Sequence, residues 1–169
     1  MSSHAGPLAH DNLPPVTIDR TLAATPRPVI KARDYWLALR GEREMPAREE
    51  ILPRDMRDFL AHVGLVEAMQ LPDGSEDYAM RLMGGRIEEV FGAISKKPIC
   101  EVLPPAIAAR WRAVFDEVRN HRQPLVLTGR VAHENLRHLK YELFAAPLGE
   151  GANDDVPMIF GVLDLWAVT

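Results

Sequence analysis

The order of elements around residues 78–103 constrains the fold of this chain more than any other feature of its sequence. Residues 78–83 have the composition of a strand, and Gly84-Gly85 interrupts it. Residues 86–91 then fit one short helix, and residues 98–104 fit a tight connection bounded by prolines. A longer helix and three strands follow. This order predicts one small α+β domain in which strands and helices are segregated along the chain.

Periodicity supports the remaining elements of that domain. Residues 106–120 place apolar side chains at helical spacing, and residues 62–68 are rich in strand formers. Residues 71–76 have a turn composition, so the strands on either side should form a hairpin.

Three further strands are expected near the C-terminus. Residues 125–131 and 138–148 alternate apolar and polar side chains, whereas residues 156–166 are apolar on both faces. The second pattern is typical of a central strand that is covered on both sides. Because the connections are short, neighbouring strands should be antiparallel.

The N-terminal part divides into two segments. Residues 1–28 hold five of the 14 prolines and few large apolar side chains, which predicts a flexible tail. Residues 29–40 are expected to form a helix that ends at Gly41. This helix is the first element of one folded domain, which is predicted to span residues 29–169.

Composition excludes several classes of protein. A net charge of −4 argues against a nucleic-acid binder. A single cysteine, Cys100, cannot form an internal disulfide, and no apolar run approaches the roughly 20 residues that span a bilayer. The N-terminus lacks a secretory signal, so we expect a cytoplasmic protein without membrane insertion.

An ordered set of short motifs resembles the PAS superfamily over about residues 33–166. Tyr35-Trp36, the Arg40-Gly41 turn, Met45-Pro-Ala-Arg48, Arg81-Leu-Met-Gly84 and Leu103-Pro104 carry the resemblance. It is closest to short bacterial PAS proteins with one sensory domain and no attached output domain. The resemblance implies a five-stranded antiparallel sheet in the order 2-1-5-4-3, with helices over one face. It also implies a sensory or scaffolding role.

A ligand pocket would lie between those helices and the sheet. Eight residues are expected to line it: Met80, Leu82, Phe91, Trp111, Phe115, Leu127, Tyr141 and Phe160. The polar atoms of Trp111 and Tyr141 could orient a small hydrophobic ligand there. The alternative is that these side chains pack into a core without a cavity.

The sequence names no cofactor and argues against haem and flavin. Cys100 lies where light-sensing PAS domains bind flavin, but the Asn, Arg and Gln that accompany the cysteine there are missing, so we read it as a small buried side chain. Haem would need a histidine within the long helix, whose only histidine, His121, falls at its end. His62 fits a hydrogen-bonded histidine better than a haem ligand.

Metal binding and catalysis are not favoured either. His133, Glu134 and His138 surround one turn and could be metal ligands, but a solvated loop explains them as well. Enzyme motifs such as G-x-S-x-G, H-E-x-x-H and phosphate-binding loops are absent. The best available catalytic pair is His62 with Glu67 or Asp164.

These observations predict a non-catalytic PAS module of bacterial signal transduction that binds a small ligand, a partner protein or both. The alternatives are a small α+β enzyme acting on a hydrophobic metabolite and a structural adaptor with a filled core. Helix 29–40 carries more apolar area than one docked face can hide, so we expect a homodimer with Tyr35, Trp36, Leu37 and Leu39 in its interface. Alternatively, this helix covers its own sheet.

Overall fold

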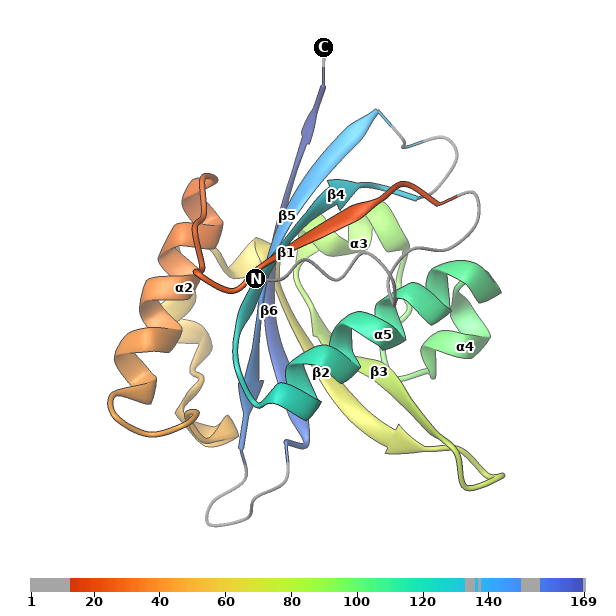
Figure 1. The fold of residues 1–169 in the computed structure, drawn as a ribbon, viewed down its shortest axis with the longest axis horizontal. Coiled ribbons are helices and arrows are strands. Elements are labelled where there is room, and N and C mark those ends of the chain that lie inside the picture. Colours follow the sequence, from red (N-terminus) through yellow and green to blue (C-terminus); the bar gives the residue numbers. More distant parts are fainter. Residues whose placement is uncertain (1–12, 133–135, 137, 150–155, 169) are drawn as a thin grey trace.

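One antiparallel sheet forms the centre of the molecule, in the strand order β1-β4-β5-β6-β2-β3 (Figure 1). This is a computed structural model, and it describes residues 13–132, 136, 138–149 and 156–168. The strands are β1 (Val16–Asp19), β2 (Val63–Gln70), β3 (Glu76–Met83), β4 (Leu125–Arg130), β5 (Leu139–Leu148) and β6 (Met158–Ala167). The helices are α2 (Arg27–Arg40), α3 (Gly85–Phe91), α4 (Ile99–Val102) and α5 (Pro105–His121), with short 3-10 helices at Arg48–Glu50, Pro53–Met56 and Leu60–His62.

In the described residues the sheet has six strands and not the predicted five, so its full order differs from the predicted 2-1-5-4-3 by one additional strand. The additional strand, β1, lies at the edge and pairs with β4 from Val16↔Gly129 to Asp19↔Val126. Without it, the neighbours run β4-β5-β6-β2-β3. Val16 and Ile18 are buried in the core, so the prediction of a flexible tail is wrong for this strand. Residues 1–12 of that predicted tail lie outside the described residues.

Local sequence sets the ends of the two long helices. Helix α2 begins at Arg27, directly after Pro26, and ends at Gly41, whose φ of 58° few other residues adopt readily. Helix α5 begins at Pro105, where the missing N–H of proline costs no hydrogen bond. The expected boundaries of both helices therefore shift by only one or two residues.

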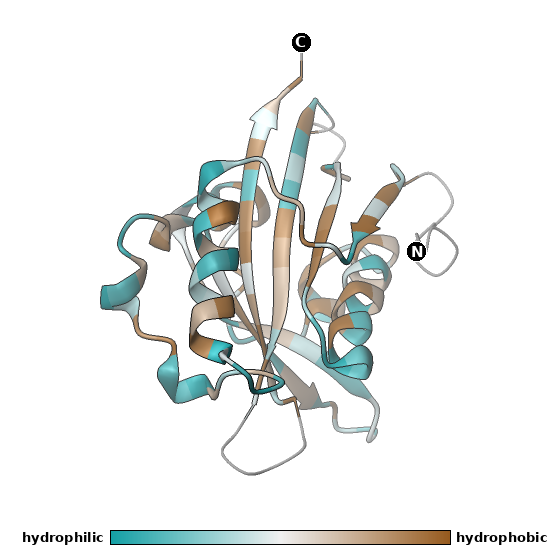
Figure 2. Ribbon diagram, turned by 60° about the vertical axis from the view of Figure 1, so that its left-hand side comes forward, coloured by the Kyte–Doolittle hydropathy of each residue, from teal (hydrophilic) through white to brown (hydrophobic). Residues whose placement is uncertain are grey.

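Helices cover both faces of the sheet, whereas the family resemblance had implied helices over one face only. Helix α2 and the 3-10 helices pack on one face, and α3, α4 and α5 pack on the other (Figures 1 and 2). Strands β5 and β6 supply apolar side chains to both layers, with Phe144 toward α2 and Leu143 toward α5. Each face is apolar and has to be removed from water, so two helical layers are needed.

Trp36 lies inside the core of its own chain. It is 0% exposed, its indole N–H donates to the carbonyl of Pro147 over 3.1 Å, and its ring meets Phe144 edge-on. The prediction that Trp36 forms a dimer interface is therefore wrong. Tyr35, Leu37 and Leu39 are partly buried against the same core, so α2 covers its own sheet. Homodimerisation through the remaining surface of α2 stays a prediction.

Replacing Trp36 by alanine should therefore weaken folding. We expect Trp36→Ala to lower the free energy of unfolding by about 3–5 kcal/mol, because it leaves a cavity and an unbonded carbonyl. Leu39→Ala, on the same helix but partly exposed, should cost only about 1 kcal/mol. Urea denaturation measures both. A Trp36→Ala protein with unchanged stability and a halved native mass would return this side chain to a dimer interface.

Candidate functional site

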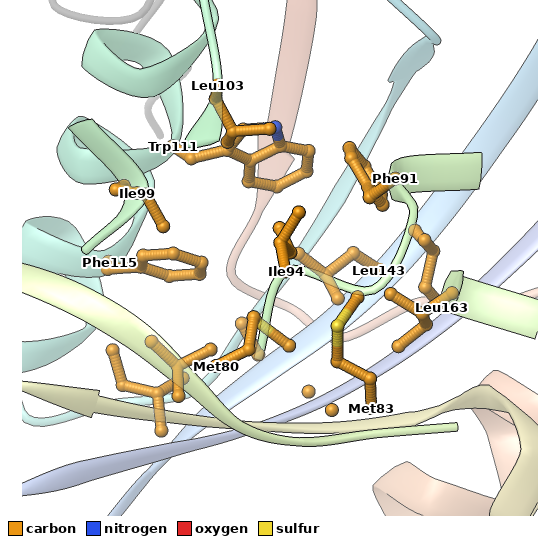
Figure 3. Close-up of a pocket in the computed structure, with 16 residues that line it drawn as sticks. Met80, Met83, Phe91, Ile94, Ile99, Leu103, Trp111, Phe115, Leu143 and Leu163 are labelled. Carbon is orange, nitrogen blue, oxygen red and sulfur yellow. The ribbon is translucent and has the colours of Figure 1, made fainter. Parts of the chain in front are cut away.

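A cavity of about 70 Å³ lies between the sheet and the layer of α3, α4 and α5 (Figure 3). Strands β2, β3, β5 and β6 form its floor, and the helices with the segment between α3 and α4 form its roof and walls. The residues lining it are Gly64, Val66, Met80, Met83, Ile87, Phe91, Ile94, Ile99, Leu103, Trp111, Phe115, Leu143, Ala145, Ile159, Gly161 and Leu163.

Small residues in adjacent strands create the space at the floor. Ala145 pairs with Gly161, and Gly161 pairs with Gly64 in the next strand. A methyl group built on Gly64 would come within 2.9 Å of the Cε of Met80. One on Gly161 would meet Leu143 at 3.4 Å. Ala145, Gly161 and Gly64 thus form a row of small residues across three strands. Because these residues have little or no side chain, space remains between the sheet and the helices above it.

Aromatic rings and methionines enclose the rest of the cavity. The ring of Trp111 stacks on Phe115 and meets Phe91 edge-on, with centroids 6.0 and 6.1 Å apart. In the close-up, Met80 and Met83 extend from β3 toward these rings (Figure 3). Phe91, Trp111 and both methionines are partly exposed, so this side is the mouth of the cavity.

The cavity suits an apolar guest of small size. Only apolar atoms face it, so it offers no hydrogen bond to water or to a polar ligand. An engineered apolar cavity of about 150 Å³ stays dry and accepts benzene. The cavity here has a smaller volume, so it fits a hydrocarbon group smaller than benzene. Methionine side chains adapt their shape readily, so Met80 and Met83 can widen the mouth.

The structure brings together part of the predicted pocket. Met80, Phe91, Trp111 and Phe115 all line the cavity. Leu82, Leu127, Tyr141 and Phe160 do not.

Leu82 is excluded by a β-bulge. The register passes from Leu65↔Leu82 to Val66↔Met80, so Arg81 is an extra residue in β3. A bulge interrupts the alternation of side chains, which puts Met80 on the cavity face and Leu82 on the α2 face. Phe160 also faces α2, where its ring meets Phe144 at 6.3 Å. Because β6 is apolar on both faces, its pattern could not show which residues face the cavity.

Leu127 and Tyr141 lie beside the cavity rather than on it. Leu127 is 0% exposed and pairs with Leu143, which separates it from the cavity. Tyr141 lines a second chamber of about 20 Å³ on the far side of Trp111. The ring centroids of Tyr141 and Trp111 are 5.8 Å apart. Tyr141 is thus near the site but is not part of the apolar wall.

Sequence reasoning missed a buried carboxylate that holds one wall. Asp77 is 1% exposed, accepts the backbone N–H of Cys100 over 3.0 Å and pairs with Arg112 at 3.1 Å. Burial alone would raise the pKa of Asp77, but the bonds from Cys100 and Arg112 lower it below its usual value. Cys100 follows Ile99 and Arg112 follows Trp111, and both preceding residues line the cavity. No sequence signal marked Asp77, because it directly follows Glu76 and resembles the end of the polar turn before the strand.

The candidate cofactor residues do not surround the cavity. Cys100 is exposed, whereas the sequence predicted a buried side chain. A hydrogen bond with Asp77 raises the pKa of the Cys100 thiol. His121 contacts the carbonyl of Glu117 in its own helix, through Nδ1 at 3.1 Å. Within the described residues, no group of three His, Cys, Asp or Glu could hold a metal ion. His133 and Glu134 of the predicted metal set lie outside them.

The candidate catalytic pair lies away from the cavity. Nδ1 of His62 contacts the carbonyl of Leu163 at 2.9 Å, and Asp164 is farther away at 3.6 Å. Asp164 pairs across the sheet with Glu142. Burial and the neighbouring carboxylates of Asp164 and Asp19 raise the pKa of Glu142. None of these side chains lines the cavity, so they make no catalytic dyad there.

A sheet with helices on both faces and an apolar cavity under the short helices defines a small α+β domain with an internal chamber. The family model of the PAS domain matches residues 24–164, and the chain therefore belongs to the PAS family. PAS domains are in general sensory or interaction modules. No curated protein matches this chain. In the part of the chain that the structure describes, no helix has the length and apolar character to cross a membrane.

The pairing of Asp77 makes a pH-dependent contribution to stability. Because the pKa of Asp77 is lower in the folded than in the unfolded chain, this stability is complete above the unfolded value of about 3.9 and is lost as the pH falls through the folded pKa. We expect Asp77→Asn to lose about 1–3 kcal/mol at pH 7 and much less at pH 2–3.

Urea denaturation between pH 2 and 7 measures this difference. Asp58→Asn, which removes an exposed carboxylate paired with Lys31, is the matched control and should cost less than about 1 kcal/mol. A difference between wild type and Asp77→Asn that stays constant from pH 7 to pH 2 would contradict the role given to Asp77.

Proposed function

We propose that this PAS domain is a non-catalytic sensory module that binds a small apolar molecule in the cavity under α3, α4 and α5. The wholly apolar chamber over Gly64, Gly161 and Ala145 carries the proposal. Protein interiors are close-packed, so an open space of this kind is uncommon. At about 24 cal/mol per Å³, an empty cavity of this size costs roughly 2 kcal/mol, which a guest that fills it would recover.

We further propose that the signal passes to a partner protein in a bacterial, cytoplasmic pathway. The cavity roof supports this, because two of its elements, α3 and α4, are short helices near the surface. Helix α4 has four residues and is held to the sheet by the bond from the Cys100 N–H to Asp77. A guest that moves Ile99 or Leu103 would shift the exposed side of α4, where a partner could detect it.

Xenon, a small apolar probe, tests the binding site directly. We expect xenon to perturb the NMR signals of residues around Gly64, Gly161 and Ala145. Gly64→Ala should weaken this effect about tenfold, because the new methyl group occupies the floor and the flexible Met80 side chain can move to admit it. The substitution should not destabilise the chain, and alanine favours folding over glycine by roughly 0.5–1 kcal/mol.

Gly85→Ala is the matched control. It adds the same methyl group at a position where nothing lies within 4 Å, so xenon binding should stay unchanged. Absence of xenon binding in the wild type, or equal binding in the wild type and Gly64→Ala, would overturn the proposal.

A further inference from the structure

Strand β1 and the segment that follows it pack on opposite faces of the sheet. Val16 and Ile18 are buried in the core under α3, α4 and α5. Leu22 and Ala24, by contrast, pack against the core under α2. The chain therefore crosses the edge of the sheet between β1 and α2 (Figure 1). We call residues 20–26 the crossing segment.

Helix α5 holds β1 at both of its ends. Just before the strand, the carbonyl of Pro14 accepts a hydrogen bond from the guanidinium of Arg110. Just after it, Arg20 pairs with Glu117 at 2.6 Å. Arg110 and Glu117 both belong to α5 and lie about two turns apart. These contacts do not involve α2, so a β1 strand from a second copy of the chain would find them too.

The edge of β4 fits this particular strand. Val16 pairs with Gly129, and a methyl group built on Gly129 would come within 2.9 Å of Cγ1 of Val16. The pairing continues to Asp19↔Val126, which fixes the register. With only four residues, β1 has few backbone bonds to break when it leaves the edge.

The crossing segment contains a strained residue. Leu22 has a φ of 64°, in the left-handed region that residues with a side chain rarely adopt. The guanidinium of Arg33 donates to the Leu22 carbonyl over 3.0 Å and supports this conformation. In an extended crossing segment Leu22 would return to a negative φ, and seven extended residues span roughly 23 Å. Short connections under strain favour the exchange of elements between copies.

We propose that two copies of this chain form a dimer by exchanging β1, so that residues 13–19 of each copy pair with β4 of the other. The contacts of β1 with β4 and α5 are the same in both forms, and the exchanged form releases the strain at Leu22. Symmetric exchange fills both β4 edges, so the assembly closes at two copies. This inference does not use the cavity and is independent of the proposed function.

A disulfide between β1 and β4 tests the exchange. Thr17 pairs with Thr128, and Cα atoms paired across antiparallel strands lie about 4.5–5.5 Å apart, which a disulfide can bridge. Thr17→Cys and Thr128→Cys are combined in one chain with Cys100→Ser. Oxidation at low protein concentration should lock each β1 on its own chain and weaken dimerisation at least about a hundredfold in sedimentation equilibrium. A reductant should restore the dimer, and oxidation at high concentration should give a covalent dimer.

A longer crossing segment provides the second measurement. Insertion of Gly-Ser-Gly between Ala23 and Ala24 should weaken the dimer about tenfold, because Leu22 no longer needs a positive φ in the monomer. The same insertion after Asp73, in the exposed turn between β2 and β3, is the matched control and should leave the dimer unchanged. If the disulfide does not form, the two insertions still decide the question.

A wild-type protein that stays monomeric up to its solubility limit would overturn this inference. A dimer that persists after oxidation of the locked variant would place the interface elsewhere and would overturn it as well. The same holds if the insertion after Ala23 affects the dimer no more than the insertion after Asp73.

Discussion

Strands β5 and β6 carry apolar side chains on both of their faces, and each face has to be covered before the chain is stable. Burying one large apolar side chain is worth about 1.5–3 kcal/mol, so neither face can be left in water. Phe144 and Val162 face α2, and Leu143 and Leu163 face the layer that contains α5. The N-terminal helix is therefore part of the fold of its own chain. Its Trp36 indole N–H donates a hydrogen bond to the sheet, at the carbonyl of Pro147 in β5.

The cavity results from a local exception to this dense packing. Helices also cover both faces of the sheet around Ala145, Gly161 and Gly64, which are paired in adjacent strands. On the cavity face, however, these three residues have small side chains or none. Larger residues there would meet Met80 and Leu143. The helices do not collapse onto the floor, because the rings of Phe91, Trp111 and Phe115 contact one another above it.

A charged contact sets the position of the same wall. Asp77 joins β3 to the start of α4 through the Cys100 N–H and to α5 through Arg112. Since its partners directly follow Ile99 and Trp111, a single buried carboxylate fixes two residues of the cavity wall. Tyr78, the next residue in β3, donates to Asp116 at 2.6 Å and ties the same strand to α5 one turn farther along.

Periodicity and turn residues in the sequence determined the order of the elements, most of their boundaries and the family, because these depend on neighbouring residues. Helical spacing also placed Trp111 and Phe115 together on the face of α5 that lines the cavity. Only the tertiary structure decided the rest. The bulge at Arg81 moved Leu82 to the other face, and strand register aligned Gly64 with Gly161 from segments almost a hundred residues apart. Strand β1 and the pairing of Asp77 with Arg112 likewise depend on long-range contacts, and such contacts leave no periodic signal in the sequence.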